Sequence, residues 1–463
     1  MKTLNILFLF IICCITRSYA QQAPPNIIVI LVDDLGYKDV GFMGGSFYRT
    51  PHLDSLAKES LVFEQAYAAA SNCAPSRASL LTGLQTSRHG IYTVGSSERG
   101  KSEDRKLIPI KNNTTLDSNL PTIATLLSKK GYQTAAIGKW HLSDSPLNHG
   151  FSYSFGGDHS GHNKHFSPYK NKAIPDGKPG EYLTDRITNE AIDYIGQQKE
   201  SSPFFLYLSY YAVHTPLEAP DSLQNHYKGI KGTGEQDYPV YAAMIESLDH
   251  NIGKLVDKLK QQGLLENTIL WFCSDNGGIN TISPQQPLRA GKGSYFEGGV
   301  RIPFFIHWPK QIQPGRDSKS LVSHLDLLPT IKEIVEDKSS LLLDGESLWS
   351  NILGEEDLQE RVLFWHFPIY LEAYNPSKDD GRDPKFRTRP GSTIRVKNWK
   401  LHHYYEDDKY LLYNLSSDIG ERINIASEYP DILKKMKSEL KKKILDTHAK
   451  IPRKLNPNYK DGL

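Results

Sequence analysis

Cysteine is scarce in this chain of 463 residues, which has four. Cys13 and Cys14 lie within an apolar N-terminal stretch, so only Cys73 and Cys273 remain for the rest of the chain. Two cysteines form at most one bridge, which excludes the disulfide-rich scaffolds of small secreted domains. A single disulfide between Cys73 and Cys273 is the simplest structural explanation for the pair.

Long apolar runs are also missing from the chain after its N-terminal stretch. No segment of that remainder resembles a membrane span. Residues 1–20 combine a lysine, a short apolar run and small residues before Gln21. This pattern predicts a secretory signal peptide, because a membrane span needs roughly 20 apolar residues. A lipoprotein anchor is disfavoured because Ile12, which is not a small residue, precedes Cys13. We therefore expect an exported protein, periplasmic or secreted, without a membrane span.

An excess of charge of one sign is absent. The chain has 55 Lys+Arg and 53 Asp+Glu; removing residues 1–20, which hold Lys2 and Arg17 but no acid, leaves 53 of each sign. This balance argues against a general polyanion binder, and we expect no nucleic-acid partner. Recognition of an anion must therefore be local.

Several short apolar runs predict strands that are buried on both faces, as in a mostly parallel sheet. These runs span 26–32, 134–138, 204–211, 268–273 and 302–308. Helical periodicity lies between them, as in 120–131 and in 241–263, where Gly263 ends the pattern. The alternation predicts an α/β sandwich with a large core.

Polar residues follow four of these strands directly. Each has an ordinary explanation when taken alone, such as a turn, a cap or a structural histidine. Ligands of open α/β sheets bind beyond the carboxyl ends of the strands, so these side chains are expected to meet at one edge. The residues are Asp33 and Asp34, then Lys139 and His141, then His214, then Asp275 and Asn276.

This set suits the cleavage of a tetrahedral, oxygen-rich anion. Asp33, Asp34, Asp275 and Asn276 offer hard oxygen ligands, which favours Ca²⁺ or Mg²⁺ over zinc. Arg77, Lys139 and Lys292 supply positive charge for the anion, and histidines can move protons. Pro75 suits the first turn of a helix, which places Cys73 at a helix N-terminus, where anions bind.

The motifs resemble those of the type I sulfatases of the alkaline-phosphatase superfamily. Residues 73–77 fit the C-x-P-x-R signature, and residues 138–141 fit the G-K-W-H signature. The other motifs match in the same order along nearly the whole chain. The resemblance implies a large mixed, mostly parallel sheet sandwiched by helices, with a smaller C-terminal antiparallel sheet plus helix.

The resemblance also implies a role for Cys73. In this family a maturation enzyme oxidises the motif cysteine to Cα-formylglycine, whose hydrate carries two hydroxyl groups on one carbon. One oxygen attacks sulfur and displaces the alcohol, and loss of the other proton then expels sulfate. The residues alone leave Ca²⁺ and Mg²⁺ open, and the resemblance favours Ca²⁺.

Further roles are implied residue by residue. Ca²⁺ would be bound by Asp33, Asp34, Asp275, Asn276 and the modified residue 73. Arg77 would hold the hydrate, while Lys139 and Lys292 would bind sulfate oxygens. His141 would assist deprotonation of the hydrate, and His214 would protonate the leaving alcohol. Structural roles are expected for Arg301, His89 and the buried Cys273.

The tail predicts a second unit. We expect a catalytic α/β domain over residues 21–345 and a C-terminal α+β subdomain over 346–463. Runs at 361–368, 392–405 and 409–426 read as strands separated by turns, and residues 430–450 form an amphipathic helix. Ile432, Met436 and Leu440 lie on one face of that helix.

The expected substrate is a sulfated carbohydrate, such as an algal galactan, ulvan or a glycosaminoglycan fragment. Two loops are candidates for its rim. Residues 156–169 hold His159, His162 and His165, and are read as a pocket wall, a surface loop or a metal cluster. The long loop 374–391, read as mobile or substrate-facing, holds Arg382, Arg387 and Arg389, which could contact an acidic glycan, as could His366. The particular sugar and sulfate position cannot be read from the sequence.

Two other functions share many of these residues. A phosphodiesterase or phosphonate monoester hydrolase of the same superfamily would prefer phosphorus esters. A non-catalytic glycan-binding protein would keep Cys73 unmodified.

Overall fold

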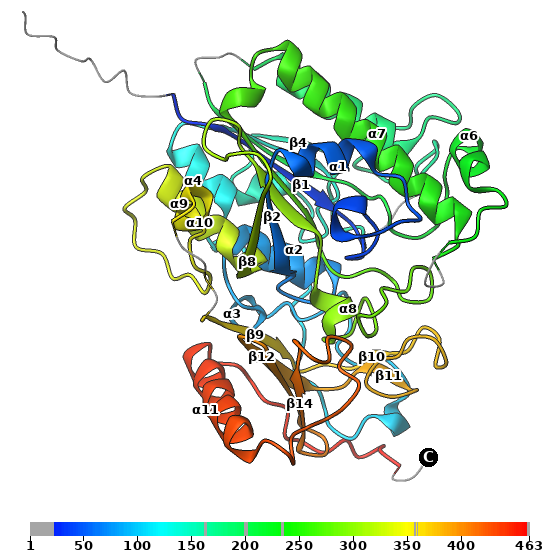
Figure 1. Cartoon of the computed structure of the whole chain (residues 1–463), viewed down its shortest axis with the longest axis vertical. Helices are drawn as coiled ribbons and strands as arrows, with labels where there is room; N and C mark the ends of the chain where they lie inside the picture. Colours follow the sequence, from blue (N-terminus) through cyan, green and yellow to red (C-terminus); the bar gives the residue numbers. More distant parts are fainter. Residues whose placement is uncertain are drawn as a thin grey trace, which may run out of the picture.

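An eight-stranded sheet forms the centre of the larger of two units in the computed structural model, which describes residues 23–161, 164–198, 202–232, 236–355, 358 and 360–460 (Figure 1). In spatial order its strands are β4 (Tyr153–Phe155), β3 (Gln133–Gly138), β5 (Phe204–Ser209), β1 (Asn26–Val32), β6 (Thr268–Ser274), β7 (Phe304–His307), β2 (Leu61–Tyr67) and β8 (Arg316–Ser323). The strands are parallel apart from β7, which runs antiparallel to β6 and β2. The mixed, mostly parallel sheet is confirmed. The predicted signal peptide, residues 1–20, lies outside the described residues.

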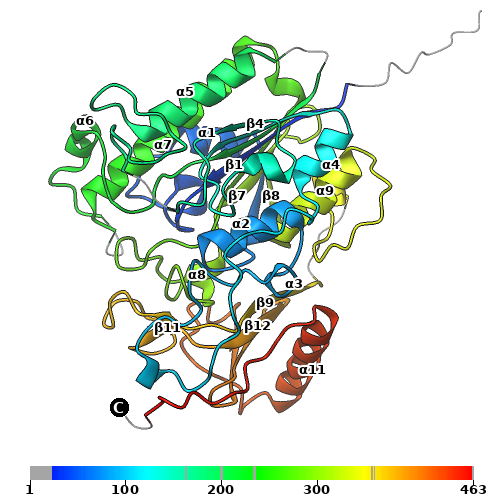
Figure 2. The same cartoon turned by 180° about the vertical axis from the view of Figure 1, so that it is seen from behind.

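Helices cover both faces of this sheet (Figures 1 and 2). One face carries α1 (Pro51–Lys58), α5 (Leu183–Gly196) and α7 (Pro239–Gln261), with α6 (Asp221–Gln224) beside α7; the other carries α2 (Cys73–Thr82), α4 (Ile123–Lys129), α9 (Leu327–Ile334) and α10 (Trp349–Leu353). Strand β1 shows why its sequence is continuously apolar. Ile28 and Ile30 join the core under α7, while Ile27 and Val29 join the core under α2.

A four-stranded antiparallel sheet forms the smaller unit. Its order is β14 (Lys409–Asn414), β13 (Trp399–Tyr404), β12 (Gly391–Val396) and β9 (Val362–Phe367). Helix α11 (Pro430–Asp446) covers the outer face with buried Met436 and Leu440 and half-buried Ile432, as predicted. The ribbon of β10 (Leu371–Glu372) and β11 (Phe386–Thr388) lies beside this sheet. The domain boundary at 345/346 stays a prediction.

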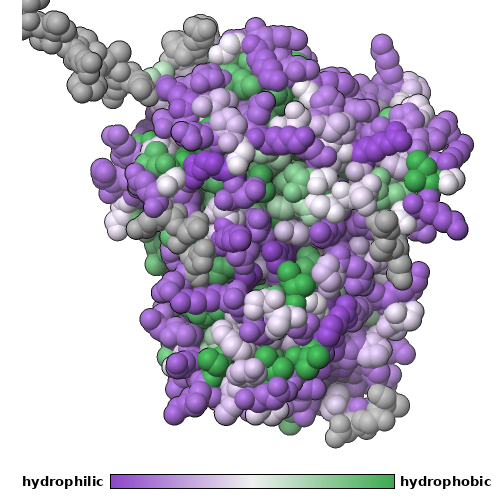
Figure 3. Space-filling view, viewed as in Figure 1, coloured by the Kyte–Doolittle hydropathy of each residue, from purple (hydrophilic) through white to green (hydrophobic). Residues whose placement is uncertain are grey.

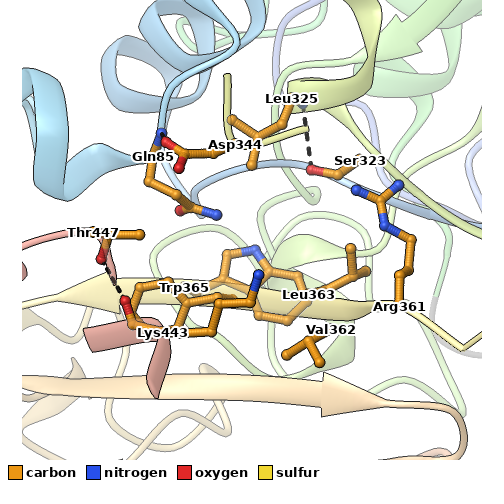
Figure 4. A pocket seen from close by; sticks show the side chains of 11 residues that line it. Gln85, Ser323, Leu325, Asp344, Arg361, Val362, Leu363, Trp365, Lys443 and Thr447 are labelled. Carbon is orange, nitrogen blue, oxygen red and sulfur yellow. Dashed lines mark hydrogen bonds between the residues drawn. The ribbon is translucent and has the colours of Figure 1, made fainter. Parts of the chain in front are cut away.

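The inner face of the small sheet packs on the large unit near α3 (Thr86–His89) and α8 (Glu297–Val300). Tyr67, Phe296 and Trp365 are buried in this joint. A small polar cavity lies in the same joint and is lined by Asp344, Arg361 and Lys443, among others (Figure 4). None of its lining residues belongs to the predicted site.

The described surface is dominated by hydrophilic side chains, with small scattered apolar groups on the face in Figure 3. Among the described residues, no helix has the length and apolar character needed to cross a bilayer.

Candidate active site

Cys73 opens helix α2, as Pro75 predicted, and its side chain is buried. Its Sγ lies 3.2 Å from Asp33 Oδ1 and 3.8 Å from Asp34 Oδ1. Cys73 and Cys273 are both free, so the disulfide between them is ruled out. Burial, reinforced by Asp275 and Asp33, raises the pKa of the Cys73 thiol well above its ordinary value. An unmodified Cys73 would therefore be a protonated thiol and a poor nucleophile.

The carboxyl ends of β1, β3, β5 and β6 bring the predicted residues together at one edge. Ligand atoms of Asp33, Asp34, Cys73 and Asp275 all lie within 4.8 Å of one another. Gly138 permits the close approach of β3 and β5, because a Cβ atom there would lie 1.9 Å from the Ser209 carbonyl oxygen. Strand β3 therefore ends directly before Lys139, whose side chain reaches the carboxylate cluster.

Three cations balance the three buried carboxylates. Lys139 Nζ lies 2.5 Å from Asp33 Oδ2, and Lys292 Nζ lies 2.7 Å from Asp34 Oδ2. Arg77 pairs with Asp275, at 2.8 Å from Nη2 to Oδ2, and also donates to the Ser209 hydroxyl. Each acid in the cluster thus has its own cation.

The carboxylates repel one another in spite of this pairing. Burial, together with the charge of Asp33, raises the pKa of Asp275 to about 6. Burial also disfavours the charge of Asp34, but Lys292 and His214 outweigh it and lower its pKa. A divalent cation among these groups would relieve the repulsion.

Asn276 supplies an independent indication of a cation ligand set. Its Nδ2 donates to Asp34 Oδ1 at 2.8 Å, which orients the amide. Its Oδ1 is buried and has no hydrogen-bond partner among the described residues. Buried polar atoms normally have partners, so this oxygen is suited to a metal. Together with the carboxylates it fits a hard cation such as Ca²⁺ or Mg²⁺.

The two predicted histidines lie near the cluster. His141 has a buried Nδ1 without a partner in the described part of the chain. Burial and then Lys139 hold the pKa of His141 well below its ordinary value, so the ring is neutral and can accept a proton. Nε2 of His214 lies 3.6 Å from Asp34 Oδ2, while its Nδ1 lies 2.5 Å from the Thr215 carbonyl oxygen. Burial and Lys292 lower the pKa of His214 to about 3.

Ser209 was not predicted to act at the site, while His165 and Arg387 were predicted only as candidates for the substrate rim. Ser209 bonds Arg77, and His165 Nε2 lies 2.9 Å from the His214 carbonyl oxygen. Arg387 Nη1 donates to the Lys292 carbonyl at 2.7 Å. Strand position could have indicated Ser209, which ends β5, but no local pattern links Arg387 to Lys292.

Other expectations for the rim need correction. His366 is buried, and its ring nitrogens lie near Ser392 Oγ and the Lys450 carbonyl oxygen, so it cannot contact a glycan. Arg382 pairs with Asp407, and Arg389 pairs with Asp383 and Glu406, so carboxylates balance their charge, while the contact of either with a glycan stays a prediction.

Two further sets of predictions can be compared with the structure, those for the histidine-rich segment 156–169 and those for the residues expected to be structural. No metal cluster forms from His159 and His165 in the described part of the loop, and His162 lies outside it. Arg301 pairs with Glu297, His89 lies 3.0 Å from Ser79 Oγ, and Cys273 is buried, all as expected.

The buried carboxylates and their paired cations lie at the carboxyl edge of the mixed sheet, and a small C-terminal sheet packs on the same unit. This fold and this site together define a class of protein, the ester hydrolases of the alkaline-phosphatase superfamily. The sequence model of the family described as Sulfatase matches residues 25–336. A second, described as N-sulphoglucosamine sulphohydrolase, C-terminal, matches residues 291–449. The chain belongs to the sulfatase family, whose members are sulfuric ester hydrolases.

Individual relatives agree over most of their length. The chain is 30% identical to a sulfatase of Formosa agariphila, with 94% of this chain and 91% of that protein covered. It is 31% identical to human N-acetylgalactosamine-6-sulfatase, with 90% and 84% covered. The solved structure of Ps i-CgsB in complex with a neocarrahexaose has a TM-score of 0.76 and 31% identity, and covers 94% of this chain and 95% of that one.

Proposed function

We propose that this sulfatase removes sulfate from a sulfated carbohydrate, using Cys73 converted to Cα-formylglycine and a bound Ca²⁺. The observation that carries the proposal is the cluster of Cys73 with three carboxylates and their three paired cations. Asn276 donates to one of these carboxylates, Asp34, and its buried oxygen has no partner among the described residues. The support for a sugar substrate is that the relatives include an N-acetylgalactosamine-6-sulfatase and a structure that holds a neocarrahexaose.

Asp33, Asp34, Asp275 and Asn276, with modified residue 73, would hold Ca²⁺. The hydrated formylglycine supplies an oxygen nucleophile, and the cation supplies Lewis acidity. Lys139 and Lys292 now neutralise Asp33 and Asp34, which the cation would neutralise instead. Both ammonium groups would then bind the sulfate oxygens and offset negative charge as the ester bond breaks.

Proton transfer is assigned to the two histidines. His141, neutral and with an unpartnered Nδ1, accepts a proton from the residue 73 hydroxyl. His214 Nε2 faces the cluster and donates to the leaving alcohol oxygen. The ring is neutral here, so His214 must gain its proton when the anionic ester binds, because a nearby negative charge raises the pKa of an imidazole.

The cellular location is part of the proposal. Residues 1–20 would direct export and be removed, and a maturation enzyme would oxidise Cys73 before the chain folds around it. The mature protein would work in the periplasm or outside the cell.

The test is peptide mass mapping of residue 73 in protein from the native host, followed by turnover assays. We expect an aldehyde in place of the thiol, release of sulfate from a sulfated oligosaccharide, and no turnover by Cys73→Ala. Matched phosphate esters should be poorer substrates by at least about tenfold in kcat/KM.

Three outcomes would contradict the proposal. A preference for phosphate esters would favour a phosphodiesterase or phosphonate hydrolase. An intact thiol together with sugar binding but no turnover would indicate a glycan-binding protein. An intact thiol with full sulfate release would rule out the formylglycine chemistry.

A further inference from the structure

The segment between β10 and β11, residues 373–385 and here called the rim loop, is attached to the catalytic unit beside the site. Arg289 donates to the carbonyl oxygens of Asp380 and Gly381 at 3.1 and 3.0 Å. Asn280 Nδ2 donates to the Lys378 carbonyl at 2.5 Å. Both donors lie in the chain that follows Asp275 and Asn276. The rim loop is therefore held against the catalytic unit, which disfavours the mobile reading of this segment, while the substrate-facing reading stays a prediction.

Arg387 connects the rim loop to the site itself. Its side chain is only 3% exposed, and its Nε and Nη1 donate to the carbonyl oxygens of Glu372 and Lys292, at 2.9 and 2.7 Å. Gly293 makes room for this contact, because a Cβ atom there would lie 2.4 Å from Arg387 Nη1. The guanidinium thus ties the backbone of Lys292 to the start of the rim loop.

Tyr374 lies on the other side of the same guanidinium. The Cζ of Arg387 lies 3.5 Å from the centroid of the Tyr374 ring, a close cation–π contact that covers one ring face. Tyr374 remains 52% exposed, more than any other aromatic side chain in the described part of the chain. Asp379 fixes the turn by accepting the backbone N–H groups of Tyr374 and Asn375.

Arg387 links Tyr374 to Lys292, because its Nη1 donates to the Lys292 carbonyl oxygen while its Cζ lies against the Tyr374 ring. An exposed aromatic ring, held rigidly beside the cation assigned to sulfate, suits the apolar face of a sugar ring.

We propose that Tyr374 is a specificity-determining residue that packs against the sugar of the substrate, and that Arg387 is a positioning residue that fixes Tyr374 relative to Lys292. This inference rests on the proposed function and deepens it. The smaller unit thereby supplies one wall of a site whose chemical groups come from the larger unit. A substrate that lacks a sugar ring would gain little from that wall.

The test compares two kinds of substrate, sulfated sugars and a small aryl ester, on matured protein. N-acetylgalactosamine 6-sulfate and a sulfated neocarrahexaose serve as sugar probes, and 4-nitrophenyl sulfate serves as the small ester. Tyr374→Ala should raise KM for the hydrolysed sugar by at least about tenfold, with a markedly smaller loss for the aryl ester. Tyr374→Phe, which keeps the ring, should retain most of the sugar activity.

Two further variants separate binding from folding. Tyr429→Ala removes a tyrosine that is 44% exposed and whose ring contacts Trp399 at a tilted angle beside α11, and should leave both activities unchanged. Arg387→Lys keeps the charge but loses the paired carbonyl contacts, and should lower kcat on both substrates by disturbing Lys292. Where aryl ester turnover is too slow, sugar affinity of the Cys73→Ser and Cys73→Ser/Tyr374→Ala proteins gives the same comparison.

Equal losses on both substrates, or no loss on the sugar, in a Tyr374→Ala protein of normal melting temperature would overturn this inference alone. Failure of wild-type protein bearing formylglycine to bind or hydrolyse any sulfated sugar would overturn the proposed function, and this inference with it.

Discussion

At the scale of single residues, the most informative atom is the buried amide oxygen of Asn276. It has no protein partner among the described residues, while the amide nitrogen of the same side chain donates to Asp34. The site therefore holds four side chains with oxygen atoms suited to a cation. In this structure the three carboxylates pair instead with Arg77, Lys139 and Lys292, which are assigned to catalysis. If a cation binds here as proposed, it should raise the stability of the folded protein.

We predict that Ca²⁺ raises the melting temperature and that EDTA reverses the effect, because an ion that binds only the folded state stabilises it. Asn276→Ala should weaken Ca²⁺ binding by about tenfold, or about 1.4 kcal/mol. Calorimetric titration and thermal unfolding with and without Ca²⁺ measure both effects. Asp317→Asn, at an exposed carboxylate, is the control. An identical Ca²⁺ affinity in Asn276→Ala and wild type would remove Asn276 from the ligand set.

At the scale of elements, helix α7 stabilises the start of helix α1. Asp249 of α7 accepts the backbone N–H groups of His52 and Leu53, at 3.1 and 2.8 Å. These N–H groups belong to the first turn of α1 and have no partner within their own helix. Burial nevertheless raises the pKa of Asp249 to about 6, since these hydrogen bonds offset desolvation only in part.

The folded state therefore holds the Asp249 proton more tightly than the unfolded state does. Its contribution to stability is greatest at low pH and falls as pH rises from about 4 to about 6. We predict that the difference in unfolding free energy between wild type and Asp249→Asn declines across this window, by at most about 3 kcal/mol. Urea unfolding at a series of pH values measures it. Asp257→Asn, at an exposed position of α7, should show no such decline; a flat difference for Asp249→Asn would refute the prediction.

At the scale of the whole molecule, a buried ionic network joins the two units. Lys400 of β13 lies 2.8 Å from Glu297 of α8 and 3.3 Å from Glu421, and all three side chains have no exposed surface. Glu421 also accepts the backbone N–H of Glu297 at 2.6 Å and lies 2.7 Å from His402 Nε2. The network fixes α8, which follows the loop that carries Lys292.

We predict that Lys400→Met destabilises the protein by about 3–5 kcal/mol, because the buried Glu421 loses its lysine partner and Glu297 keeps only Arg301. Chemical unfolding measures the loss. Lys397→Met, in the adjacent turn, removes a surface pair with Glu360 and should cost less than about 1 kcal/mol. Equal effects of the two substitutions would show that burial of the network does not govern its energy. Sulfate release by Lys400→Met should also fall if α8 positions Lys292.

Much of the fold followed from local pattern. All five strands predicted for the large sheet are present, because strands buried on both faces must be continuously apolar. Strands β2 and β8 were missed, since β2 contains Glu64 and Gln65 and β8 begins with charged residues. The antiparallel direction of β7 was also not predicted, because an apolar run has no direction.

The sequence by itself determined the chemical groups of the site, because most of them follow a strand or lie in the first two turns of helix α2. Strand ends placed Asp33, Lys139 and Asp275, and Pro75 placed Cys73. Only the tertiary structure decided which groups touch. Segments far apart in the chain come together in three places. They form the contact of Arg387 with Lys292, the surroundings that bury His366, and the network around Lys400. Such contacts depend on how two units pack, and side-chain packing across a joint leaves no periodic trace in the sequence.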